Sequence, residues 1–224
     1  MRIAICLLLT IATLVVQEGK SYGDFIVTPG PSQSINVLPF GGLTDVRYQQ
    51  IYSSSLFTNA GVTSPVAITA LRFSPDVNGV YGAGINLRLN QTTHAVGGLS
   101  TNLDQNATGS FVTVLNNPNF SQSVIGGDLT YTLRLGFDAN PFIYDPTTGQ
   151  NLLMDVLVTN KLGGFAFYRG GDTGLTARAS SDTSDGLGLR TLIEYQAVPE
   201  PSSVALLAVS FLACGLRRSR SHRS

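Results

Sequence analysis

Apolar and polar residues alternate with a period of two through the middle of the chain. Aliphatic residues occupy every second position across residues 85–89, and apolar residues do so again across residues 129–137. Because a strand directs successive side chains to opposite faces, each run predicts a half-buried β-strand. Comparable runs predict further strands at residues 24–28, 34–38, 46–53, 66–73, 110–115, 152–159, 165–169 and 189–195.

Turn-forming residues separate these runs. Pro29-Gly30-Pro31, Asn116-Asn117-Pro118 and Asp145-Pro146 are typical of turns, and residues 172–188, rich in Gly, Asp, Ser and Thr, read as one long loop. A helix fits only as a single turn. About ten short strands at this spacing predict an all-β body, a two-sheet sandwich that is jelly-roll-like.

The N-terminus has the pattern of a secretory signal peptide. Met1-Arg2 supplies a short positive region, and residues 3–16 then contain no charged residue. Small residues at Ser21 and Gly23 suit a signal peptidase. We therefore predict a signal peptide over residues 1–23 and a mature chain that begins at Asp24, which places the protein outside the cytoplasm.

The C-terminus combines three features in a fixed order. Pro199-Glu200-Pro201 comes first, an uncharged apolar run over residues 204–216 follows, and an arginine cluster that includes Arg217 and Arg218 ends the chain. Thirteen residues form a helix of about 20 Å, shorter than a hydrocarbon core of about 30 Å. The arginines should stay on the cytoplasmic side of a membrane, so the body faces outward.

This C-terminal segment, over residues 198–224, resembles the PEP-CTERM sorting signal of bacteria. The resemblance implies recognition by an exosortase, a membrane-embedded transpeptidase or protease, and delivery to the cell envelope, the surface or the extracellular matrix. The residues that carry it are Pro199, Glu200, Pro201, Arg217 and Arg218. It also implies only a transient membrane stage, through the apolar helix. The alternative is a plain tail anchor, which would need no signal peptide and usually has a longer span.

Charge argues against a nucleic-acid partner for the body. The whole chain has fourteen basic and fourteen acidic residues. Six of the basic and two of the acidic residues lie in the terminal segments, which leaves eight against twelve in residues 24–198. A mildly acidic surface repels phosphate backbones. Both cysteines, Cys6 and Cys214, also fall in the terminal segments, so the body must rely on its hydrophobic core.

The body offers few groups for catalysis or metal binding. His94 has no second His or Cys nearby in the sequence with which to bind a transition metal. Two Asp-x-Asn pairs, Asp76 with Asn78 and Asp138 with Asn140, contain oxygen ligands of the kind that calcium prefers, although turn capping is the simpler explanation for them. We therefore predict no cofactor, with calcium as the alternative.

Three functions remain for residues 24–197. The first is a non-catalytic envelope or matrix protein. The second is a carbohydrate-binding module for exopolysaccharide, and the third is a polysaccharide hydrolase that would need Asp138, Asp145 or Asp155 to converge. Aromatic rings could stack on sugars, although core packing explains most of them. These are Tyr48, Tyr52, Phe57, Tyr81, Phe142, Tyr144, Phe165, Phe167 and Tyr168.

Overall fold

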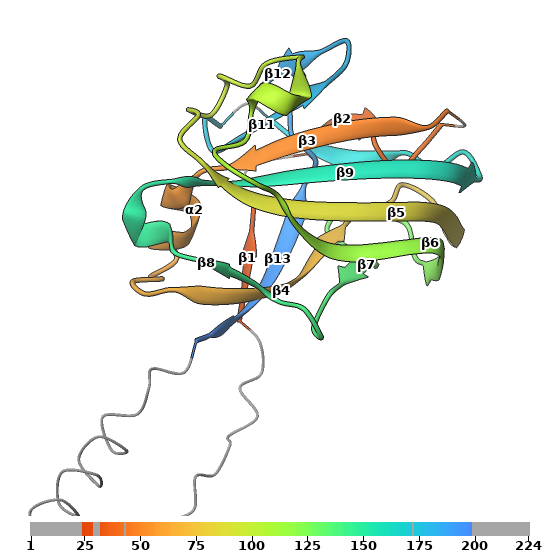
Figure 1. Cartoon of the computed structure of the whole chain (residues 1–224). Coiled ribbons are helices and arrows are strands. Elements are labelled where there is room, and N and C mark those ends of the chain that lie inside the picture. Colours follow the sequence, from red (N-terminus) through yellow and green to blue (C-terminus); the bar gives the residue numbers. More distant parts are fainter. Residues whose placement is uncertain (1–23, 29–31, 43, 172, 199–224) are drawn as a thin grey trace, which may run out of the picture.

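The structure, a computed structural model, is built almost entirely from antiparallel strands (Figure 1). It describes residues 24–28, 32–42, 44–171 and 173–198. The prediction of an all-β body is confirmed. The described helical segments are short: α2 (Ser54–Asn59) and the single turns η1 (Leu103–Gln105) and η2 (Pro146–Thr148).

The strands form two main sheets and one small one. The five-stranded sheet has the order β1 (Asp24–Val27), β13 (Thr191–Ala197), β4 (Val66–Phe73) and β7 (Leu133–Gly136). The fifth strand, β8 (Phe142–Tyr144), lies on the same side of β4 as β7: β7 pairs with residues 70–73 of β4 and β8 with residues 66–68. The six-stranded sheet has the order β12 (Ser184–Asp185), β11 (Thr176–Ser180), β3 (Val46–Tyr52), β9 (Asn151–Leu162), β5 (Gly79–Thr92) and β6 (Val112–Val124). Strands β10 (Phe167–Gly170) and β2 (Ser32–Asn36) pair with each other.

Eight of these strands pass back and forth between the two sheets, except that β5 and β6 follow each other in the same sheet. We renumber β1, β3, β4, β5, β6, β7, β9 and β13 from one to eight along the chain. The first sheet then has the order 1-8-3-6 and the second has the order 2-7-4-5. Apart from the pair β5 and β6, neighbours within each sheet are distant in the sequence, and this wraps the chain around one core.

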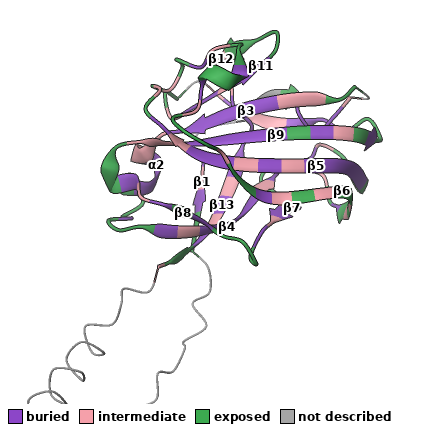
Figure 2. Cartoon of the chain, viewed as in Figure 1, coloured by how far each residue is buried: buried purple, intermediate pink, exposed green. Residues whose placement is uncertain are grey.

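That core lies between the two main sheets. Ile68 and Phe73 of β4 belong to the same buried cluster as Ile85 and Leu87 of β5. Phe40 lies among other rings, with centroids 4.7 Å from Phe73, 5.4 Å from Phe167 and 6.1 Å from Tyr81. Figure 2 shows long buried stretches along β3, β9 and β5, and exposed residues on the loops beside β11 and β12. Burial of each such side chain stabilises the fold by about 1.5–3 kcal/mol.

A second, smaller core covers part of the outer face of the six-stranded sheet. Leu99 and Leu103, from the long connection between β5 and β6, pack on Ile51, Leu153 and Ala177 of the sheet. The strands β9 and β3 are therefore buried on both faces at this end. This explains why residues 152–154 are all apolar instead of alternating.

The structure corrects three sequence predictions. Asn116-Asn117-Pro118 is not a turn but lies inside β6, an edge strand in which proline costs no internal ladder bond. Leu129 and Tyr131 have positive φ, so the run predicted to begin at residue 129 forms a strand only from Leu133. The loop predicted over residues 172–188 contains β11, whose small side chains give a weak strand signal, and β12.

The two ends of the described body lie side by side. Strand β1 pairs with β13, and Asp24 lies opposite Tyr195. Residue 24 is where we expect the mature chain to begin, and the sorting segment follows directly after β13. Residues 24 and 197 therefore lie at the same end of the five-stranded sheet (Figure 1).

Candidate functional site

The sequence-predicted sorting residues lie beyond the described part of the chain. Strand β13 ends at Ala197, and Pro199, Glu200, Pro201, Arg217 and Arg218 all follow the last described residue, Val198. The predicted signal peptide over residues 1–23 likewise lies outside the described residues. Among the described helices, none is long and apolar enough to cross a membrane.

A densely hydrogen-bonded polar cluster surrounds Asp155 on β9. This side chain is fully buried on the outer face of the six-stranded sheet. It accepts hydrogen bonds from Arg47 Nη2 at 2.7 Å, Arg47 Nε at 3.0 Å, Arg88 Nη2 at 3.1 Å and Gln49 Nε2 at 2.6 Å. Residues 49, 88 and 155 meet because they are register partners on β3, β5 and β9.

Neighbouring groups extend this cluster under the connection between β5 and β6. Arg47 Nη1 donates to Asp104 at 2.7 Å, and the Arg88 guanidinium lies 4.8 Å from the centroid of the Phe111 ring. The hydrogen bond from Arg47 holds the pKa of Asp104 below its usual range. Asn106, also buried, donates to Gln49 at 2.7 Å. With both arginines engaged, the arrangement fixes a loop on a sheet and leaves no free acid–base pair within the cluster.

A second ionic cluster lies on the five-stranded sheet. Glu194 of β13 accepts from Arg134 Nη2 at 2.8 Å and pairs with Arg72, and Arg134 also contacts Asp138 at 2.9 Å. Burial alone would raise the pKa of Glu194, but the hydrogen bonds from the two arginines outweigh it and the pKa falls below its usual value. Arg134 lowers the pKa of Asp138 in the same way.

The structure does not join the three carboxylates considered for hydrolysis into one cluster. Asp155 is held by Arg47 and Arg88, and Asp138 is held by Arg134 on the other main sheet. Asp145 caps the η2 turn, where it accepts from the backbone N–H of Thr147 at 2.9 Å. Each of the three therefore has its own local partner.

The calcium candidates are engaged in loop contacts. Asp76 accepts from the backbone N–H of Ala166, and Asn78 accepts from that of Gly126. Asp138 pairs with Arg134, as described above, and Asn140 donates to the carbonyl of Thr113 at 3.0 Å. In the described part of the chain, no group of three or more His, Cys, Asp or Glu residues could hold a metal ion. His94 contacts the carbonyl of Gln105 at 3.0 Å.

Eight of the nine aromatic side chains considered for sugar stacking are buried, and Tyr168 is half-buried. Phe25 on β1, which the sequence analysis did not single out, is 64% exposed. The eight buried rings therefore serve the core.

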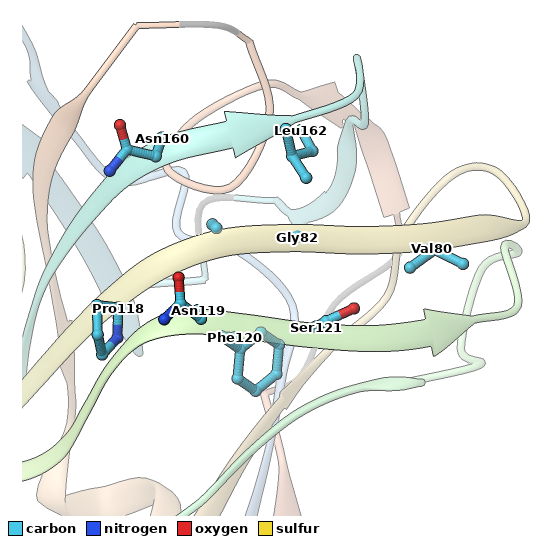
Figure 3. Close-up of a pocket in the computed structure, with 9 residues that line it drawn as sticks. Val80, Gly82, Pro118, Asn119, Phe120, Ser121, Asn160 and Leu162 are labelled. Atoms are coloured by element: carbon cyan, nitrogen blue, oxygen red, sulfur yellow. The ribbon is translucent and has the colours of Figure 1, made fainter.

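A trough on the outer face of the six-stranded sheet is the feature that sequence reasoning missed. One hollow of about 420 Å³ lies over β5, β6 and the end of β9, and a second of about 190 Å³ shares Pro118 with it. Figure 3 shows Gly82 of β5 between Asn160 of β9 and Asn119 of β6. We call these two hollows together the trough. The signal that could have indicated it is Gly82-Ala83-Gly84, since glycines inside a strand mark bulges and open surface.

Comparison with known proteins finds a match at the C-terminus. No curated protein and no solved structure matches the chain significantly. Residues 197–221 match the PEP-CTERM protein-sorting motif, and this range includes all five residues that carried the resemblance in the sequence. The chain therefore carries a PEP-CTERM sorting signal directly behind the last strand of an all-β body.

Proposed function

We propose that this chain is an exported, non-catalytic protein of the cell envelope or extracellular matrix, trimmed by a signal peptidase and by an exosortase. The match over residues 197–221 carries the proposal, because a PEP-CTERM signal implies export and exosortase processing. The charge-free run over residues 3–16 supports N-terminal export. The membrane is then occupied only by a precursor, through the apolar run over residues 204–216.

The body, over residues 24–197, is on this proposal a jelly-roll sandwich. The strand orders 1-8-3-6 and 2-7-4-5, with antiparallel neighbours and one shared core, support it. A non-catalytic role is supported by the carboxylates, because Asp155 and Glu194 are each held between two arginines. A rigid sandwich without a disulfide among its described residues suits a surface component that is built once and then remains in place.

Binding of exopolysaccharide is the second candidate function, and the trough favours it. Ligand sites are concave and combine apolar surface with a few polar groups, and this trough has both properties. The non-catalytic role and the binding role are compatible, because a matrix protein can be retained by the polymer that it binds.

The sorting proposal is tested by changing the signal in the native cells. Glu200→Ala, or deletion of residues 217–223, should leave a longer precursor in the membrane fraction. Without the glutamate the enzyme loses the charge between the two prolines, and without the arginines the helix loses its cytoplasmic anchor. Ser203→Ala and the double change of Arg217 and Arg218 to lysine are the controls, and both should mature normally. Normal maturation of the Glu200→Ala and deletion variants would contradict the proposal.

A further inference from the structure

We propose that the trough binds a chain of neutral polysaccharide, an inference that deepens the second candidate function and rests on export to the surface. The floor of the trough is the backbone of β5, where Gly82 and Gly84 carry no side chain. The space left by the missing side chains is taken by β9, because a Cβ at Gly82 would lie 3.0 Å from Leu162 Cδ1 and a Cβ at Gly84 would lie 2.4 Å from Thr159 Oγ1. The two glycines therefore let Leu162 and Thr159 fold over β5, where both line the trough.

Bulges on both neighbours of β5 border this floor. Between the pairs Gly82↔Leu162 and Gly84↔Thr159, β9 has two residues and β5 has one, and Asn160 there has a φ of 49°. On the other side, two residues of β6, Pro118 and Asn119, lie opposite Gly84 alone. Bulges re-aim side chains and are common beside functional sites. Here they place an asparagine on each side of the same glycines (Figure 3).

The polar groups of the trough suit hydroxyl groups. The lining contains amide and hydroxyl side chains but no Asp, Glu, Lys, Arg or His. Amides offer both donors and acceptors, as sugar hydroxyls do. The polar side chains concerned are Asn86, Asn116, Asn119, Ser121, Thr159 and Asn160. An anionic polymer would find no cation in this lining, so a neutral chain is the better match.

One group in the trough lacks the partner that burial usually requires. Asn86 Oδ1 is buried and has no hydrogen-bond partner among the described residues, and Asn86 lines the smaller hollow. A buried acceptor left unpaired is costly. The residue as a whole is only half-buried, so a turn of its amide toward the hollow would let Oδ1 accept from a ligand hydroxyl.

The apolar part of the trough suits the C–H faces of sugar rings. Leu162 is 68% exposed and Val80 is 63% exposed, and both line the larger hollow. The two hollows share Pro118 and follow β5, so successive sugar units of one chain can occupy them. A polymer therefore fits the geometry better than a free monosaccharide.

Binding is tested with the full chain in a polyoxyethylene detergent, because sugar-based detergents would compete. The protein is run in native gels that contain dextran, hydroxyethyl cellulose, galactomannan or, as an anionic comparison, alginate. We expect at least one neutral polymer to retard the protein. Asn119→Ala combined with Asn160→Gly should weaken that retardation at least tenfold, since glycine accepts the positive φ at residue 160. Asn59→Ala, at the exposed end of α2, is the matched control.

A fluorescent variant gives a second readout that does not depend on loss of binding. The chain has no tryptophan, so Val80→Trp places a single reporter at the rim of the trough. Its emission should shift when the retarding polymer is added, and a tryptophan at residue 59 should not respond. No retardation by any neutral polymer, retardation by alginate alone, or unchanged binding by the double variant would overturn the proposal. Exosortase processing of the trough variants is followed separately. If the variants lose polymer binding but their C-terminus is still processed normally, the sorting proposal is unaffected.

Discussion

Replacement of Asp155 by asparagine should destabilise the body strongly. The change keeps the shape but removes the charge that two arginines share, and it turns one acceptor oxygen into a donor that faces Arg47, Arg88 and Gln49. Breaking a buried ion pair costs about 3–5 kcal/mol. Both arginine side chains remain about a third exposed, at 28% and 33%, so water recovers part of the loss. We therefore expect about 3 kcal/mol.

Asp104→Asn is the matched control for this prediction. It removes a carboxylate from the same arginine, Arg47, at the same N–O distance of 2.7 Å, but the Asp104 side chain is 81% exposed. Water screens an exposed pair, so this change should have little effect on the free energy of unfolding. Urea unfolding of the full chain, with the m-value checked for constancy, measures both changes. Thermal unfolding gives a second measurement. At about 2–4 °C per kcal/mol, the melting temperature of the Asp155→Asn variant should fall by about 6–12 °C. Equal effects of the two changes would refute the reasoning.

Two further predictions concern acid and backbone packing. Because the folded-state pKa of Glu194 lies below its ordinary value of 4.5, its stabilisation is complete well above pH 4.5 and is lost as the pH falls through the folded pKa. Glu194→Gln should lower the free energy of unfolding by about 1–2 kcal/mol at pH 7 and by less as the pH drops below 4. A difference in melting temperature between the variant and the unchanged protein that stays the same at every pH would contradict this. A Cβ at Gly41 would lie 1.8 Å from the Phe165 carbonyl oxygen, so Gly41→Ala should cost about 2–3 kcal/mol in urea unfolding. Gly164→Ala, with no atom within 4 Å, should be neutral or slightly stabilising, and an equal loss in both would be inconsistent with the packing.

Periodicity was a good guide wherever a strand has one buried face. Ile85, Leu87 and Leu89 are all buried, as their alternation predicts, and so are Leu133 and Leu135. The alternation of apolar and polar residues is a weaker guide where a strand is buried by a loop that packs on it. Strand β11 is covered by the connection over residues 93–111, and its Ala177 and Ala179 are too small to produce a strong strand signal. Its pairing with β3 is a tertiary contact that local propensity does not encode.

The candidate functional residues also differ in how far the sequence alone could predict them. The sorting signal is a continuous stretch, so Pro199, Glu200 and Pro201 could be found from the sequence alone. The Asp155 cluster and the trough depend on the register of β3, β5, β6 and β9, which joins residues that are distant in the sequence. Asp155 entered the sequence analysis as a possible acid, and the structure shows it held by arginines. The bulges at Asn160 and Pro118 follow from register shifts that no single strand reveals.

Intact-mass spectrometry of the mature protein from its native cells tests the central claim most directly. The account predicts a body that begins near Asp24 and has lost the apolar run and the arginine cluster behind Pro199-Glu200-Pro201. Any lipid or glycan joined by the processing enzyme would appear as added mass on that shortened chain. A mature species that retains residues 206–224 would instead identify the tail as a permanent anchor and contradict the account.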